Sequence, residues 1–431
     1  MRKVAIIVLF QLLDIAASQT SYGRQFFLGF PRNSDVGQSH QISIDIVTRV
    51  KAQTVSLTIQ SPFQHGLNAN KTLKFTSQKT FSLSDGYELH FTERDRRGVY
   101  VEANHDVAVF VTNVQGDNSG DTYAAIPVQG LGNKYVVAAY EHFDFSYPSE
   151  FLIVATQDNT DVHMSFPNGS RFTLDLQKYD VYQESSPRGD LSGTVITSNN
   201  NFSLFGGATC GELKNDNGPF NGCDFMVDQI PPLNGNNRNI EVIIPEIFHQ
   251  NYVYRIYSGN VTSQICHRNK TRGQAECLQS SDFNHNMYES TMTNGTSAVY
   301  CKSADFFVAL YKDQQGFMMI IPSIDQYLTS YRFLIPSIYS SGQNHYIAVI
   351  VPTAEKAGIM INGQPDSPIA STLVVSPFEN YTVVTYRVSN LHVNDVTHSA
   401  GNVKFGLFCY GYKDRSPASA YGFAIGFAFG M

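Results

Sequence analysis

His105 and Asp106 stand together in ANHDVAVF and come closest to a catalytic arrangement. A hydrolase needs a nucleophile, a base and an orienting group that meet in one place. The sequence contains no GxSxG elbow, no phosphate-binding loop and no dinucleotide fingerprint. A turn before an apolar strand explains both residues without chemistry, so we expect no catalytic residues and no enzyme. Paired carboxylates for glycoside hydrolysis are an alternative that spacing along the chain does not test.

Two acidic stretches have the residue types of a calcium loop. DNTD (Asp158–Asp161) forms a polar corner inside SEFLIVATQDNTDVHMSF, and GDNSGD covers Gly116–Asp121. Asn and Asp favour turns because they tolerate left-handed backbone, so a plain turn explains DNTD, with calcium as the alternative. GDNSGD lacks the terminal glutamate of an EF-hand loop and is expected to be a solvated linker. Without CxxC or HExxH, zinc is not indicated, and we expect no metal and no cofactor.

An even number of cysteines in an exported chain indicates disulfides. The six cysteines are Cys210, Cys223, Cys266, Cys277, Cys301 and Cys409. Cys210 and Cys223 flank the polar loop GELKNDNGPFNG, so we pair them. Cys266 and Cys277 flank a similar loop, HRNKTRGQAE, which leaves Cys301 to pair with Cys409.

The N-terminus has the layout of a secretory signal peptide, predicted for residues 1–18. Arg2 and Lys3 precede a short apolar stretch, Val4 to Leu13, and small residues follow it. An amphipathic N-terminal helix is the alternative. Asn-X-Ser/Thr sequons, which mark surface glycosylation sites in secreted proteins, occur at Asn70, Asn168, Asn201, Asn260, Asn269, Asn294 and Asn380. We therefore expect a secreted, extracellular glycoprotein.

Short stretches rich in Val, Ile, Phe, Tyr and Thr, separated by Gly, Asn, Asp and Pro, indicate an all-β chain. The pattern of strand, hairpin, polar bend and apolar strand recurs about four times. The bend-strand segments are VYVEANHDVAVFVTN, VITSNNNFSLFGGATC, VYCKSADFFVALYK and VTHSAGNVKFGLFCYGY. Ile-Pro steps separate the repeats, since proline cannot donate a ladder hydrogen bond.

This periodicity predicts about four tandem β-sandwich-like units that pack together. The predicted units are 19–126, 127–229, 230–320 and 321–431. Roughly 100 residues is the size of a small β-sandwich domain. A four-bladed, propeller-like arrangement is the alternative, and it would bring the first unit against the fourth.

Without a catalytic motif, recognition is the remaining role. The segment EHFDFSYPSE places Phe143, Phe145 and Tyr147 in a loop, and we expect these aromatic side chains to form a contact patch. The net charge of −7 is spread along the chain without a basic stripe, so nucleic acid is not an expected partner. The uncharged run AYGFAIGFAFGM is too short and too rich in glycine for stable membrane insertion.

Three stretches together resemble one family. SEFLIVATQDNTDVHMSF, CDFMVDQIPPL and VYVEANHDVAVFVTN are similar to the N-terminal domain of the IgG Fc-binding proteins, which are mucus-associated secreted glycoproteins. The resemblance runs from about residue 23 to about residue 423 and implies an extracellular binding or adhesion domain. It also implies immunoglobulin Fc as a candidate partner, but no family motif assigns the residues that contact Fc.

We therefore expect a secreted, non-catalytic protein that recognises an extracellular protein or glycoprotein, with immunoglobulin Fc as one candidate. A carbohydrate-binding module and a self-associating mucus or matrix component are the two alternatives.

Overall fold

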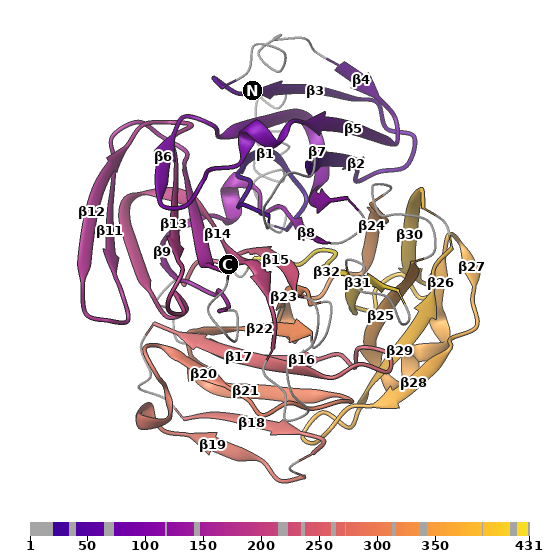
Figure 1. The fold of residues 1–431 in the computed structure, drawn as a ribbon. Helices are drawn as coiled ribbons and strands as arrows, with labels where there is room; N and C mark the ends of the chain where they lie inside the picture. Colours follow the sequence, from indigo (N-terminus) through magenta and orange to yellow (C-terminus); the bar gives the residue numbers. More distant parts are fainter. Residues whose placement is uncertain are drawn as a thin grey trace, which may run out of the picture.

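Strands form nearly all of the regular structure in the computed structural model (Figure 1). The structure describes residues 20–429 except 34–39, 64–72, 117–118, 142–146, 214–222, 234–237, 260–263, 272, 313–315, 337–342, 390 and 414–419. Helical segments in the described chain are short 3-10 turns: η1 (Asp85–Tyr87), η2 (Val128–Gly130), η3 (Ser280–Asp282), η4 (Ile324–Gln326) and η5 (Thr353–Gly358). The signal peptide predicted for residues 1–18 lies outside the described residues.

Four groups of strands surround a common centre (Figure 1). In the first and second groups one long strand joins an outer and an inner part of one sheet, whereas the third and fourth groups each contain two separate sheets. The strands of the first unit are β1 (Gly23–Leu28), β2 (His40–Thr48), β3 (Val55–Gln60), β4 (Leu73–Phe75), β5 (Gln78–Leu83), β7 (Val99–Gln115) and β8 (Ser119–Ala124). The first part of β7 pairs with β1 and β3 in an outer sheet. Its second part pairs with β2 and β8 in an inner sheet.

The second unit repeats this arrangement around the long strand β14. Its strands are β9 (Gly132–Val136), β10 (Ser149–Ala155), β11 (Thr160–Ser165), β12 (Arg171–Leu176), β13 (Val181–Ser186), β14 (Val195–Gly211) and β15 (Asp224–Gln229). β14 pairs with β9 and β11 on one side of its polar bend and with β10 and β15 on the other. The short strand β6 (Glu93–Asp95), which precedes β7 in the chain, extends this inner sheet by pairing with β13.

In the third and fourth units the polar bend divides the long strand into two strands. The third unit contains β16 (Arg238–Ile244), β17 (Tyr252–Ser258), β18 (Ile265–Asn269), β19 (Glu276–Leu278), β20 (Met287–Glu289), β21 (Ser297–Ala304), β22 (Phe306–Lys312) and β23 (Met318–Ile321). The fourth contains β24 (Ser330–Leu334), β25 (Asn344–Pro352), β26 (Ile359–Ile361), β27 (Gln364–Pro365), β28 (Ala370–Leu373), β29 (Tyr381–Arg387), β30 (Val393–His398), β31 (Gly406–Tyr412) and β32 (Tyr421–Ala424). The prediction of an all-β chain with four tandem β-sandwich-like units is confirmed.

We propose that the units divide at residues 126/127, 229/230 and 320/321, as the sequence indicates. The ends of the inner sheets support this division, because β8 ends at Ala124, β15 at Gln229 and β23 at Ile321, one residue beyond the third boundary. Strand β6 is the exception, since it lies within 19–126 but belongs to a sheet of the second unit.

The burial of the strands explains why some are wholly apolar and others alternate. Every residue of β10, in an inner sheet, is buried, whereas buried and exposed residues alternate along β11, in the outer sheet of the same unit. β22 and β31 are likewise fully buried inner strands. A strand covered on both faces reads as a continuous apolar run, and a strand with one solvated face reads with a period of two.

Apolar clusters join each unit to the next one around the centre. The cluster of the first unit includes Leu152 and Phe205 of the second, and that of the second includes Tyr257 and Phe307 of the third. The third unit's cluster includes the fourth unit's Ala348 and Tyr410. The fourth unit's cluster includes Val47 and Phe110 of the first, which closes the series. Each inner sheet is therefore covered on one face by its own unit and on the other by a neighbouring unit.

The four units form a closed ring, not an open row. Strand β8 lies beside β15 and β32, and β23 lies beside the same two strands. The chain ends also meet, because Thr20 forms an isolated bridge with Ala428. The first unit therefore contacts the fourth. The propeller-like alternative requires this contact, and here each blade has the size of a β-sandwich.

The innermost strands are sheet edges, and buried aspartates bind their main-chain N–H groups. Asp121 on β8 accepts hydrogen bonds from the N–H groups of Val227 on β15 (3.1 Å), Met318 on β23 (3.2 Å) and Gly422 on β32 (3.2 Å). One carboxyl group thus joins the first unit to all three others. An N–H group buried without a partner costs free energy, so these bonds stabilise the closed ring.

Two further aspartates on β15 act in the same way, and we call Asp121, Asp224 and Asp228 the central aspartates. Asp224 accepts from the N–H groups of Gly120 and Ala420, each at 2.8 Å, and Asp228 accepts from the N–H of Ile320 at 2.7 Å. The prediction that Gly116–Asp121 is a solvated linker is wrong for Asp121, which is 0% exposed.

We expect Asp121→Ala to lower the free energy of unfolding by about 3–5 kcal/mol, because main-chain N–H groups from three other units lose their acceptor. Urea unfolding followed by tyrosine fluorescence measures this change. Asp95→Ala is the control: Asp95 is a partly exposed carboxylate paired with Arg97 at 2.7 Å, and its loss should cost less than about 1 kcal/mol. Equal effects of the two substitutions would contradict the role of Asp121.

The stability of the ring should fall as the pH rises from 5 to 8. Burial raises the pKa of Asp224 and of Asp228 to about 8, although main-chain N–H donors oppose the shift. Between the unfolded value of 3.8 and about 8 the folded state holds protons that the unfolded chain has released, so raising the pH favours unfolding. The slope is at most about 1.4 kcal/mol per pH unit for each group.

Thermal unfolding at pH 5, 6, 7 and 8 checks this expectation. Asp228→Asn should reduce the slope because its side chain does not titrate. A midpoint that is constant or rises over this range would show that the central aspartates are ionised throughout.

Candidate functional site

The pair His105–Asp106 lies at the bend of β7, where Asp106 has a structural role. Its carboxylate accepts from Arg24 Nε at 3.2 Å and from Arg49 Nη1 at 3.1 Å. Both ion pairs are partly exposed to solvent. Asp106 therefore joins β1 and the corner after β2 to the bend of β7, an arrangement that a turn residue explains.

The corner Asp158–Asp161 is tied to the bend of β14 by side-chain amides. Asn199 Nδ2 donates to the carbonyl oxygen of Asn159 at 3.0 Å, and Asn200 Nδ2 donates to the same oxygen at 3.3 Å. Asn159 has a left-handed backbone with φ of 54°, as the turn interpretation expects. Within the part of the chain that the structure describes, no group of three or more His, Cys, Asp and Glu residues could hold a metal ion.

The predicted contact patch is only partly within the described residues. Phe143 and Phe145 lie outside them, and Tyr147 is 37% exposed beside the start of β10. Strand pairing places the start of β10 against the end of β13, since Ser149 is opposite Ser186. Tyr147 is therefore at the side of the second unit that faces the first.

Sequence reasoning missed a second exposed aromatic side chain, on the other side of β13. Phe91 precedes β6, is 61% exposed and has a left-handed backbone with φ of 60°, which costs a bulky residue free energy. Thr92 Oγ1, next to it, donates to the carbonyl oxygen of Ser185 on β13. The Arg32 guanidinium lies 4.7 Å from the centre of the Phe91 ring. We call Phe91 and Tyr147 the aromatic edge. The signal that could have revealed Phe91 was an aromatic residue within the mostly polar segment ELHFTERD.

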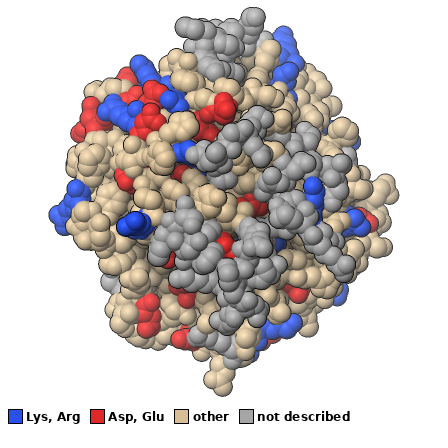
Figure 2. All heavy atoms as spheres, in the orientation of Figure 1, with Lys and Arg blue, Asp and Glu red and all other residues tan. Residues whose placement is uncertain are grey.

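Charged side chains near the aromatic edge are interspersed in sign. Figure 2 shows acidic and basic groups side by side around β6 and β13. Arg94 and Asp180, for example, form an ion pair at 2.5 Å there. Mixed charges of this kind keep the surface soluble without producing a strong field of one sign.

A larger groove of about 960 Å³ lies where the fourth unit meets the first. We call it the seam groove. Its polar lining includes Arg49, Lys51 and Gln78 from the first unit and Arg332, Asn362 and His392 from the fourth. Arg332 is mostly buried and donates to both oxygens of Asp395 at 2.6 and 2.7 Å.

A smaller cavity of about 280 Å³ lies beside the Ile-Pro steps between units. Its lining combines the apolar residues Leu131, Leu233, Phe306 and Phe427 with polar groups such as Arg238. These apolar residues are nearly completely buried, so the cavity belongs to the packing between units.

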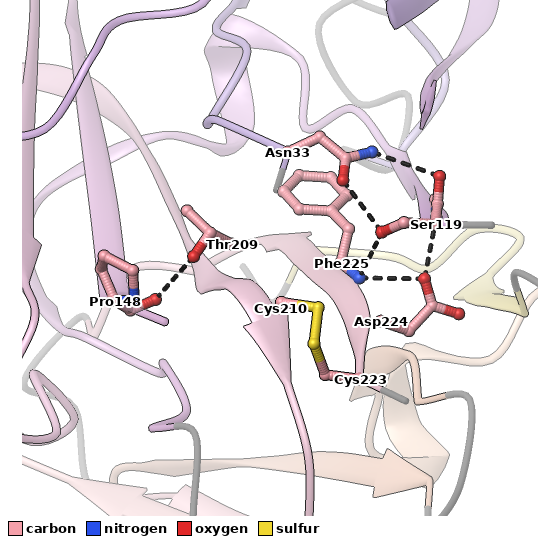
Figure 3. Close-up of a disulfide and its surroundings, with 9 residues drawn as sticks. Asn33, Ser119, Pro148, Thr209, Cys210, Cys223, Asp224 and Phe225 are labelled. Atoms are coloured by element: carbon pink, nitrogen blue, oxygen red, sulfur yellow. Dashed lines mark hydrogen bonds between the residues drawn. A yellow bond between two sulfur atoms is a disulfide. The ribbon is translucent and has the colours of Figure 1, made fainter. Parts of the chain in front are cut away.

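Two of the three predicted disulfides are confirmed. Cys266 bonds to Cys277 between β18 and β19, and Cys210 bonds to Cys223 between the end of β14 and the start of β15. Figure 3 shows that the second bridge precedes Asp224, whose carboxylate accepts from the N–H of Phe225 at 2.9 Å. This bridge therefore holds the start of the strand that carries two central aspartates.

The predicted Cys301–Cys409 bridge is wrong. Both residues are free, buried thiols. Cys301 packs in the apolar cluster of the third unit and Cys409 in the cluster between the fourth unit and the first, so their side chains lie in different cores.

Most of the described sequon asparagines are exposed, but one is not. Asn168, Asn201, Asn294 and Asn380 lie at the surface. Asn269, at the end of β18, is 1% exposed, and a glycan on this side chain would not fit the folded unit. Asn70 and Asn260 lie outside the described residues. Glycosylation at the exposed positions stays a prediction.

Comparison with known protein families gives a match to the model described as IgGFc binding protein, over residues 121–411. The chain belongs to the IgGFc binding protein family. The match covers more than half of the chain and extends from the strand that carries Asp121 to the end of β31. The resemblance found in the sequence is thus confirmed, and it indicates a binding protein of extracellular type. No curated protein matches this chain.

One solved structure with some similarity is described as "Structural insight into host cell surface retention of a 1.5-MDa bacterial ice-binding adhesin". It is 10% identical over 68% of this chain and 87% of its own, with a TM-score of 0.12. A score this low supports no argument about fold or function.

In the described part of the chain, no helix has the length and apolar character needed to cross a membrane. The two disulfides and the family both fit an extracellular protein.

Counting thiols tests the revised disulfide assignment. We expect no rapid reaction of the native protein with a maleimide, because both free cysteines are buried and burial raises the pKa of Cys409 to about 12. Denaturation without reductant should expose two thiols, and reduction should expose all six. In Cys409→Ser only one thiol should react before reduction. A denatured, unreduced chain without any reactive thiol would restore the Cys301–Cys409 bridge.

Proposed function

We propose that this protein is a secreted, non-catalytic adhesion protein that recognises another extracellular protein or glycoprotein, with immunoglobulin Fc as the first candidate. The observation that carries the proposal is membership of the IgGFc binding protein family over residues 121–411. The two disulfides support an oxidising, extracellular location, where such bonds persist. The exposed sequon asparagines support the proposal that the protein is glycosylated.

The aromatic edge is the contact surface that we assign to this function. Phe91 and Tyr147 expose large side chains at the junction of the first two units. Aromatic side chains contribute much of the binding energy at protein interfaces, because they bury large areas at a low entropic cost. Phe91 is also held in place by Arg32 and by its strained backbone, so it does not lose much freedom on binding.

Loss of the aromatic edge should weaken binding without unfolding the protein. The glycosylated protein is used to capture partners from serum and from mucosal secretions, and binding to purified immunoglobulin Fc is measured by interferometry. We expect Phe91→Ala and Tyr147→Ala each to weaken binding about tenfold or more, the range of an interface hot spot. Phe172→Ala is the matched control, since Phe172 is 46% exposed on β12 in the outer sheet of the second unit.

The outcomes separate the function from the surface. If no extracellular protein is enriched at micromolar concentration, the proposed function is wrong. If a partner binds equally well to all three variants, the function stands and the assignment of the aromatic edge is wrong. If only immunoglobulin Fc fails to bind, another extracellular protein is the partner.

A further inference from the structure

The seam groove has a charge that differs in sign from that of the whole chain. The chain has a net charge of −7. Arg49, Lys51 and Arg332 line the groove together with one carboxylate, Asp395. Counting Asp106, which pairs with Arg49, three cations face two carboxylates. The groove is therefore a locally positive region, which favours an anionic ligand.

Two of the three cations are held in fixed positions. Arg332 is fixed by both oxygens of Asp395, and Arg49 is fixed by Asp106 and by the ring of Tyr22, 5.2 Å from its guanidinium carbon. Lys51 is exposed at the corner between β2 and β3, and no ion pair among the described residues involves it. A preorganised arginine and a lysine that has no ion pair with the described residues suit a sulfate or carboxylate group.

The rest of the lining indicates which kind of anion fits. Ser77, Gln78, Ser330 and Thr397 offer hydroxyl and amide groups along the groove, and Tyr22, Tyr331, Val50 and Val393 supply the apolar part of its lining. Anchor residues of protein partners fill deep, fully desolvated pockets, which an open groove of mixed lining does not provide. A ligand that carries many hydroxyl groups beside its anionic group matches this lining.

We propose that the seam groove between the first and fourth units binds an anionic saccharide, with its sulfate or carboxylate group at Lys51 and Arg49 and its hydroxyl groups along the polar lining. This site lies between the first and fourth units, whereas the aromatic edge lies between the first and second. Its ligand is a saccharide and not a protein surface, so this proposal goes beyond the protein recognition proposed above and can fail independently of it.

Binding of the full chain to three immobilised oligosaccharides tests the proposal. One carries sulfate groups, one carries sialic acid carboxylates and one is neutral, and each is measured at low and at high salt. We expect retention by at least one anionic oligosaccharide and none by the neutral one, with weaker binding at high salt because ions screen exposed charges. The sulfated and sialylated arms show which anion the groove prefers.

Charge-reversal variants locate the site. Lys51→Glu should weaken binding about tenfold or more, and Lys51→Arg should retain it. Lys302→Glu is the matched control: it makes the same charge change at an exposed lysine on β21 in the third unit. Both lysines are exposed, so unchanged thermal unfolding midpoints confirm that the variants are folded.

Three results would overturn the proposal. The first is absence of binding to either anionic oligosaccharide at millimolar concentration and low salt. The second is an equal loss in Lys51→Glu and Lys302→Glu, which would indicate general charge attraction. The third is binding of an acidic peptide such as oligoglutamate that depends on Lys51 and is tighter than binding of the anionic oligosaccharides, which would assign the groove to a protein segment.

Discussion

Four sheet edges meet at the centre of this molecule, and their main-chain N–H groups are out of reach of water. The central aspartates supply the acceptors that these groups need. The main-chain N–H groups of one unit are thus hydrogen-bonded by side chains of another unit. Asp121 accepts from strands of all three other units at once. The four units therefore stabilise one another as a ring, although each has the form of a separate sandwich.

Apolar packing, like the hydrogen bonds, joins each unit to the next one around the ring. Each inner sheet is buried on one face by its own unit and on the other by a neighbour, so removal of one unit would expose a largely apolar face. A buried ion pair reinforces the junction of the second and third units: Arg255 on β17 donates to Asp190 at 2.6 Å and to the carbonyl oxygen of Ala139 at 2.9 Å. The disulfide before Asp224 holds a central strand at its start.

This construction puts candidate binding surfaces at the junctions between units. The aromatic edge combines a residue of the first unit with one of the second, and the seam groove combines the fourth unit with the first. Neither surface exists in one sandwich alone. A rigid ring that presents such junctions lowers the entropic cost of binding, which suits a protein whose family is a binding family.

The local structure follows from the amino-acid sequence alone. Alternation along β11, the apolar run of β10 and the polar bend of β7 each follow from side-chain chemistry within a few residues, and so do the loop-closing disulfides Cys210–Cys223 and Cys266–Cys277. The family was also recognisable, because its motifs are continuous in the chain.

Features that depend on contacts between distant parts of the chain follow from the folded arrangement of the units and not from the sequence. The sequence GDNSGD predicts a solvated aspartate, but in the folded chain Asp121 accepts hydrogen bonds from the N–H groups of three distant strands. Phe91 likewise becomes part of a surface only because β6 pairs with β13. Cys301 and Cys409 were paired by elimination, but their strands direct them into different cores. Periodicity reports which face of a strand is buried; it does not report which neighbour covers that face, because the neighbour comes from a part of the chain some 100 residues or more away.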